Sequence, residues 1–140
     1  MQEKTILFQK NDADAALATA PTQGKHALKL PDEFSRLPFT ILEDTAVDNE
    51  PEVHKHEGDL WYCLEGEVIF IYGGELIDQY EKTINGVLNV NELGGSKIKG
   101  GKEIMLHSGD WLWIPPGVPH RHGTQSTARM VIIKIHPKTT

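Results

Sequence analysis

Two short segments of the chain place three histidines and one carboxylate in strand or turn contexts, and a fold that uses them together must bring the two segments into contact. The first segment is His54-Lys55-His56-Glu57-Gly58-Asp59, and the second runs from Pro115 to His120. Side chains alternate with a period of two along a strand, so His54 and His56 are expected on one face. This composition is typical of a metal site.

The carboxylate of Asp59 joins the two histidines only if the chain bends, and Gly58 permits such a bend. His120 follows a proline-rich turn that fixes its approach. The predicted metal ligands are therefore His54, His56, Asp59 and His120. Two alternatives stay open. Asp59 orients a ligand or acts as a base if it does not reach the ion, and His122 replaces His120 if the chain stays extended.

Two or three neutral imidazoles with one carboxylate suit Fe(II), Mn(II), Ni(II), Co(II) or Zn(II), whereas calcium and magnesium prefer oxygen ligands. The predicted cofactor is therefore one divalent transition metal ion, and the sequence does not choose among these metals. Such a site keeps one or two positions for water, substrate or oxygen.

The first segment resembles the first motif of the cupin superfamily, in which a His-x-His pair is followed by three or four residues, a Glu, six residues and a Gly. His54 and His56 fit the pair, and six residues separate Asp59 from Gly66. The chain departs from the motif in having Asp for Glu, and in having only two residues between His56 and Asp59.

The second segment resembles the second cupin motif, which reads Gly, five residues, Pro-x-Gly, two residues, His, three residues, Asn. Gly109, Pro115, Gly117 and His120 fit in register, and Thr124 stands at the last position. The resemblance implies an all-β fold, a cupin double-stranded β-helix or jelly-roll barrel, here with a short N-terminal helical segment.

The resemblance also implies a function. We expect a metal-dependent enzyme, dioxygenase-like, that acts on a small organic metabolite as a homodimer. Two alternatives are a non-catalytic module that binds a metal and a small molecule, and a sugar isomerase or epimerase in which a histidine works as a base.

Composition limits the kinds of binding partner and the cellular compartment that we expect for this chain. The chain has 140 residues and a net charge of −6, with scattered basic residues, which argues against nucleic acid or an anionic membrane as a partner. A single cysteine, Cys63, forbids an intramolecular disulfide, and no apolar run is long enough to span a bilayer. The expected location is the cytoplasm.

Turn residues divide the chain into short elements. We expect a strand over residues 5–8, an alanine-rich helix of about two turns that Asn11 or Asp12 caps and Pro21 ends, and strands from residue 26 onward, among them 111–114 and 129–136. Residues 59–64 and 67–72 are predicted to pair as a hairpin. A peripheral prelude (1–35) would precede the barrel (36–140), which carries an insertion at 73–108 that is either a lid or an extra hairpin.

Several side chains have a structural interpretation. The tryptophans on barrel strands, Trp61, Trp111 and Trp113, are expected in the core, with a pocket for a flat or apolar ligand as the alternative. Cys63 is expected to be a small buried residue. We expect Arg121 and Arg129 to be ordinary solvated arginines, with anion binding as the alternative.

Overall fold

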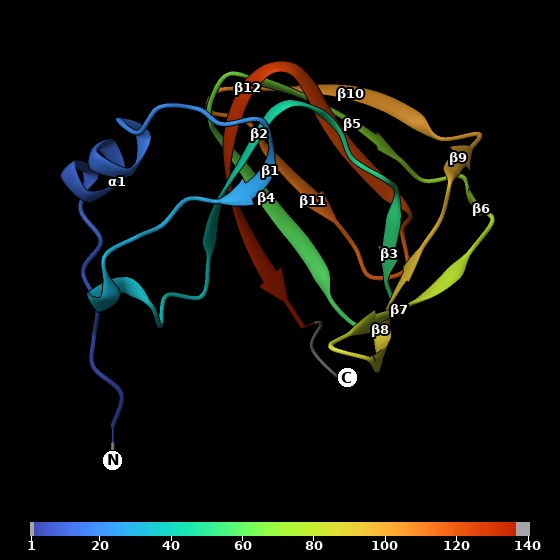
Figure 1. Ribbon diagram of the computed structural model, residues 1–140, viewed down its shortest axis with the longest axis horizontal. Helices are drawn as coiled ribbons and strands as arrows, with labels where there is room; N and C mark the ends of the chain where they lie inside the picture. Colours follow the sequence, from blue (N-terminus) through green and yellow to red (C-terminus); the bar gives the residue numbers. More distant parts are fainter. Residues whose placement is uncertain (1, 137–140) are drawn as a thin grey trace.

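The computed structural model describes residues 2–136 and is built almost entirely of strands (Figure 1). The elements in chain order are α1 (Lys10–Leu17), β1 (Gly24–Ala27), η1 (Asp32–Phe34), β2 (Thr40–Asp48), β3 (Glu52–His54), β4 (Gly58–Glu65), β5 (Glu67–Tyr72), β6 (Glu75–Ile77), β7 (Tyr80–Ile84), β8 (Val87–Gly94), β9 (Lys97–Lys99), β10 (Lys102–His107), β11 (Trp111–Ile114) and β12 (His120–Ile135). The fold class is all-β, as the sequence predicts.

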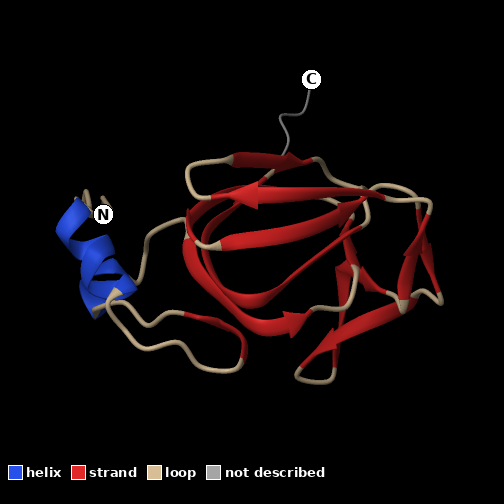
Figure 2. Ribbon diagram, turned by 90° about the horizontal axis from the view of Figure 1, so that it is seen from above, coloured by secondary structure: helices blue, strands red, loops and turns tan. Residues whose placement is uncertain are grey.

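The long strand β12 organises the sheet because it pairs with four others. Its first residues pair with β3 and β5, and its later residues pair with β2 on one side and β4 on the other. Every pairing is antiparallel, and β10 and β11 extend the sheet from β5 and β4. Figure 2 shows the strands curling around a common interior, with α1 outside this roll.

The predicted hairpin between residues 59–64 and 67–72 is wrong, although both strands exist. β4 pairs with β11 and β12, whereas β5 pairs with β10 and β12. The chain crosses β12 at Gly66, where φ is +79° and an added Cβ would lie 2.2 Å from the carbonyl oxygen of Thr127. Only glycine fits this close crossing, so the turn separates the two strands instead of pairing them.

Alternate residues of β4, β5 and β12 face the interior and form the core. The buried cluster consists of Trp61, Cys63, Val68, Phe70, Leu106, Ile114, Ala128 and Met130. Trp61 lies in the core as expected, but Trp111 and Trp113 of β11 are 61% and 45% exposed, so the expectation is wrong for these two. Asp59 shares the parity of Trp61 and Cys63 along β4, so its carboxylate is also directed inward, and it is 1% exposed. The strand period thus places a charged group in an otherwise apolar layer.

The segment before the barrel is fastened to it by a buried arginine. The predicted strand at residues 5–8 does not form. The N-cap of α1 is Gln9, two residues before Asn11, and its backbone N–H donates to Asp12. Arg129 of β12 is 2% exposed and donates to the carbonyl oxygens of Leu17 and Thr19. The expectation of a solvated Arg129 is therefore wrong.

No helix within residues 2–136 is long and apolar enough to cross a membrane.

Residues 73–108 form two small hairpin-like pairs and a strand of the roll. β6 pairs with β9, β7 pairs with β8, and β10 joins β5. The turn between β7 and β8 is Asn85-Gly86, both with positive φ, as tight hairpin turns require. Because β8 also pairs with β3, the β7–β8 hairpin is joined to the strand that carries His54.

Candidate metal centre

Cross-strand register assembles a group of buried polar side chains at one end of the roll. His120 is the direct partner of Glu52 in the pairing of β12 with β3, and His54 is the direct partner of Glu92 in the pairing of β3 with β8. Residues that face each other across antiparallel strands share one side of the sheet. Asp59 enters from β4, directly opposite Lys134 of β12.

Three of these side chains converge on one point. Asp59 Oδ2 lies 3.2 Å from His120 Nε2 and 3.5 Å from His54 Nδ1. All three atoms are buried, and none has a hydrogen-bond partner. Buried polar atoms are nearly always paired, so three unpaired ones at a single point need an explanation. A cation held between them supplies one.

The hydrogen bonds on the far side of each ring favour this explanation. His120 Nδ1 lies 3.0 Å from the carbonyl oxygen of Val118 and His54 Nε2 lies 2.8 Å from Glu92 Oε1, so each nitrogen donates its proton outward. In the neutral rings the opposite nitrogens carry the lone pairs, and these face Asp59. Metal-binding histidines are oriented in this way by a carbonyl or carboxylate on their second nitrogen.

Glu52 completes the candidate site. Its Oε1 lies 3.5 Å from His54 Nε2 and 3.9 Å from His120 Nε2. Glu52, His54 and His120 form a group whose ligand atoms all lie within 4.8 Å of one another. We use "ligand group" below for His54, Asp59 and His120 with Glu52.

His56, expected beside His54, does not join the ligand group. β3 ends at His54, and the chain turns at Lys55 and His56, both of which are exposed. The backbone N–H of His56 donates to Asn91 Oδ1, which holds this turn against β8. The alternation expected for residues 54 and 56 therefore applies to residues 52 and 54 instead, because the strand lies two residues earlier.

This shift brings the cupin spacing into agreement with the structure. Four residues separate His54 from Asp59, and Glu52 takes the place of the first histidine of the pair. The four-residue spacing was the signal in the sequence that pointed to Glu52. Glu92, Lys82 and Lys134 are also site residues that the sequence analysis missed, since only the strand register brings them here.

Ion pairs keep the site carboxylates charged. Burial raises the pKa of Asp59, but the neighbouring His120 and Lys134 outweigh burial and hold the pKa below its usual value. Burial likewise raises the pKa of Glu52, and the hydrogen bond from Lys82 reverses the effect and leaves the pKa far below the usual range. The same bond raises the pKa of Lys82 despite its burial. Both carboxylates are thus ionised at neutral pH, the state that binds a metal ion.

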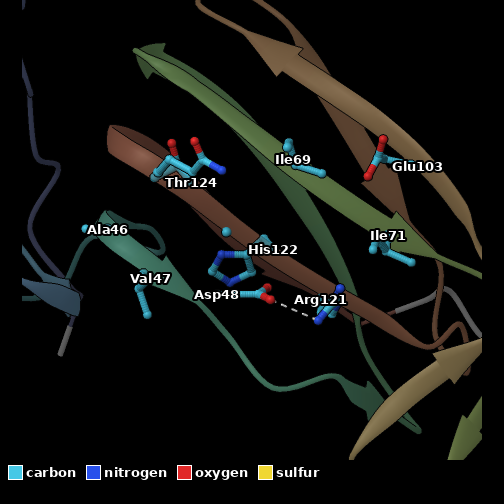
Figure 3. Close-up of a pocket in the computed structure, with 11 residues that line it drawn as sticks. Ala46, Val47, Asp48, Ile69, Ile71, Glu103, Arg121, His122 and Thr124 are labelled. Atoms are coloured by element: carbon cyan, nitrogen blue, oxygen red, sulfur yellow. Dashed lines mark hydrogen bonds and ion pairs between the residues drawn. The ribbon is translucent and has the colours of Figure 1, made fainter.

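His122, the alternative to His120, lies in a different environment. Its Nδ1 is 2.6 Å from Asp44 Oδ2, and its ring packs against Trp61 and Phe70. It also lines a pocket of about 460 Å³ between β2, β5 and β12, where Arg121 pairs with Asp48 at 3.2 Å (Figure 3). No residue of the ligand group lines this pocket.

Comparison with known proteins gives a fold but no relative in sequence. The sequence matches no family profile and no curated protein. In structure the chain is similar to E. coli YcfD, with a TM-score of 0.54 and 16% identity over 73% of this chain and 26% of that one. It is also similar to hydroxypropylphosphonic acid epoxidase (HppE) of S. wedmorenis, with a TM-score of 0.50 and 14% identity over 79% of this chain and 49% of that one.

The Fe(II) form of HppE gives the same result, with a TM-score of 0.50 and 14% identity over 80% of this chain and 50% of HppE. The chain thus spans about half the length of HppE and about a quarter of YcfD. Both are cupin-fold proteins, and this chain has the cupin fold. At these identities the likeness concerns architecture alone, so function depends on the site.

Proposed function

We propose that this protein is a metal-dependent enzyme of the cupin fold that acts on a small organic metabolite, with dioxygenase-like chemistry. The observation that carries the proposal is the convergence of His54 Nδ1, Asp59 Oδ2 and His120 Nε2, three buried atoms without hydrogen-bond partners. Two histidines and one carboxylate with open positions are the donor set of non-haem Fe(II) oxygenases, and Glu52 would add a second carboxylate beside them.

The donor set fits one divalent transition metal ion, with Fe(II) as the first choice among Fe, Mn, Ni, Co and Zn. When bound, the ion polarises an oxygen atom of the substrate and supports oxygen chemistry at its open positions. The protein contributes the rest: His54 and His120 bind through fixed nitrogens, and Glu92 and the Val118 carbonyl hold both rings in place. Further parts of the proposal are a homodimer and a cytoplasmic location, which agrees with the single free cysteine, Cys63.

The test is oxygen consumption by protein reconstituted anaerobically with Fe(II), on a panel of keto acids, diketones and phenols. We expect substrate-dependent oxygen uptake in the wild type, and none in the His120→Ala variant. Metal content by plasma mass spectrometry should give about one ion per chain in the wild type. Protein that takes up no ion after reconstitution with any of the five metals would overturn the proposal.

A non-catalytic binding module is the second candidate, and one observation favours it. Trp61 and Phe70 fill the interior beside the site, and the pocket of about 460 Å³ that His122 lines includes no ligand-group residue. A binding module predicts thermal stabilisation by a small molecule of the same panel without oxygen uptake. An enzyme predicts both effects with one compound.

A further inference from the structure

Three charged side chains, Lys82, Glu92 and Lys134, contact the ligand group, and the carboxylates of the site follow one pattern. Glu52 Oε2 accepts a hydrogen bond from Lys82 at 2.8 Å, and its Oε1 faces the imidazoles. Asp59 Oδ1 accepts from Lys134 at 2.7 Å, and its Oδ2 faces the imidazoles. Each carboxylate thus has one oxygen for a lysine and one for the centre of the site.

Glu92 repeats the pattern from the β7–β8 hairpin. Its Oε1 accepts from His54 Nε2 at 2.8 Å, and its Oε2 lies 3.5 Å from Lys82 Nζ. The carboxylates can therefore hold their lysines and an ion at the same time, because the two functions use different oxygens. Neither lysine needs to leave when the ion binds.

Exposure shows where the site opens. The side chains of Asp59 and His120 are 1% and 2% exposed, whereas those of Lys82 and Lys134 are 27% and 40% exposed. The lysines therefore lie between the ligand group and solvent. A molecule that reaches the ligand group from solvent on this side passes the two ammonium groups.

The charge of the site changes sign when a divalent ion binds. Three carboxylates and two ammonium groups leave one negative charge while both histidines are neutral. A divalent ion turns this into one positive charge, in surroundings where an uncompensated charge is costly. A neutral substrate leaves that charge in place, and a monoanion removes it.

Resting on the proposed function, we propose that the substrate class is a small organic anion, whose carboxylate pairs with Lys82 and Lys134 while a second oxygen faces the ligand group. Each ammonium has three N–H groups, and Asp59 takes only one from Lys134. Lys134 Nζ also lies 3.4 Å from His54 Nε2, so a ligand bound to it is held directly beside the ligand group. Glu52, Asp59 and Glu92 would repel the same anion until the ion is bound.

The test uses Co(II)-loaded protein, with Co(II) below the protein concentration, and two probes that differ in charge. Pyruvate and its neutral amide, pyruvamide, are titrated while the visible spectrum of bound Co(II) and the heat of binding are recorded. We expect pyruvate to bind about tenfold more tightly than pyruvamide, as a charge-assisted contact implies. Equal affinities for the two probes would overturn the inference.

Variants separate the lysines from general charge effects. Lys134→Met and Lys82→Met should each weaken pyruvate binding about tenfold and leave pyruvamide binding unchanged. Lys29→Met is the matched control, since Lys29 is exposed on the N-terminal segment and its loss changes the net charge equally. Lys134→Arg keeps the charge and should keep the preference for pyruvate. This variant keeps the inference testable if Lys134→Met does not fold.

The outcomes distinguish the two proposals. Wild-type protein that binds no Co(II) contradicts the metal site, and the substrate class fails with it. If the wild type binds Co(II), but Lys134→Met, Lys82→Met and Lys29→Met all bind pyruvate with the same affinity, only the substrate class is contradicted. Affinity for Co(II) is measured in each variant and should not fall in the two lysine variants, because removing an ammonium removes a charge that repels the ion.

Discussion

Two buried polar clusters contact the same long strand, β12, and they differ in how completely they are hydrogen-bonded. Arg129 donates to Glu43, to Glu65 and to the carbonyl oxygens of Leu17 and Thr19. Glu43 also accepts from the backbone N–H of Thr22. In the ligand group, by contrast, His54, Asp59 and His120 each keep one buried atom without a partner.

The difference separates a structural cluster from a candidate binding site. A buried network with every donor satisfied stabilises one arrangement of the chain, and here it joins the N-terminal segment to the roll. A buried group with converging unpaired atoms is costly unless something else binds there. The same strand thus serves the fold at Arg129 and contributes to a candidate metal site at His120.

The largest expected effect tests the position of the ligand group. Replacing His54 by Ala removes a ligand and should reduce metal binding by more than the roughly 10- to 100-fold known for outer-shell changes. His56→Ala is the matched control, since His56 is exposed and only its backbone holds Asn91. Metal content and affinity for Zn(II) are measured in both variants. Equal losses in the two variants would restore the His54–His56 pair as the ligands.

The next effect concerns the satisfied cluster. Arg129→Met leaves Glu43 buried and without its main partner, and breaking a buried pair in this way costs about 3–5 kcal/mol in the free energy of unfolding. Arg121→Met is the control, because its partner Asp48 is largely exposed and such surface pairs contribute about 0–1 kcal/mol. Urea denaturation compares the two. A loss at Arg129 no greater than that at Arg121 would contradict a structural role.

The sequence predicts the fold more completely than the site, and the reason is physical. Alternation and turn residues are local signals, and they placed β5 and β11 at their observed bounds. The partners of each strand depend on long-range crossing, as at Gly66, and no local signal separates a hairpin from a crossing. The ends of β3 are equally ambiguous, so the strand of His54 was predicted two residues too late.

The site residues show the same contrast between local signals and long-range pairing. His54, Asp59 and His120 were predicted from composition and spacing, and the structure brings these three together, while the ligand set itself stays a prediction. Glu92 and Lys134 reach the site only through cross-strand register. That register depends on the exact start of each paired strand along the chain. An uncertainty of one residue in any strand reverses the face of a side chain, so these contacts were out of reach.

Glu92 is predicted to position His54 without binding the ion itself. In Glu92→Ala, His54 Nε2 loses its acceptor, and its ring is free to turn. We expect affinity for Zn(II) to fall by roughly 10- to 100-fold, as for other outer-shell partners of metal-binding histidines. Glu81→Ala on the neighbouring strand β7 is the control, since Glu81 is exposed. An unchanged affinity would show that the β7–β8 hairpin does not serve the site.

The smallest expected effect is a change in the pH dependence of stability. Burial raises the pKa of Glu43, but the hydrogen bonds from Thr22 and Arg129 outweigh it, and the pKa lies below the ordinary value of 4.5. The unfolded chain then binds more protons than the folded one as the pH falls, so the contribution of Glu43 is complete above about pH 4.5 and is lost as the pH falls through the folded pKa. Glu43→Gln should therefore be less stable than the wild type at pH 7, and the gap in the free energy of unfolding should narrow toward pH 3. Asp59 and Glu52 titrate in both proteins, so the difference between the two curves reports Glu43 together with its ion pair to His26, whose Nε2 lies 2.9 Å from Glu43 Oε2. A gap that stays constant from pH 7 to pH 3 would mean that the carboxylate acts through its shape and hydrogen bonds alone.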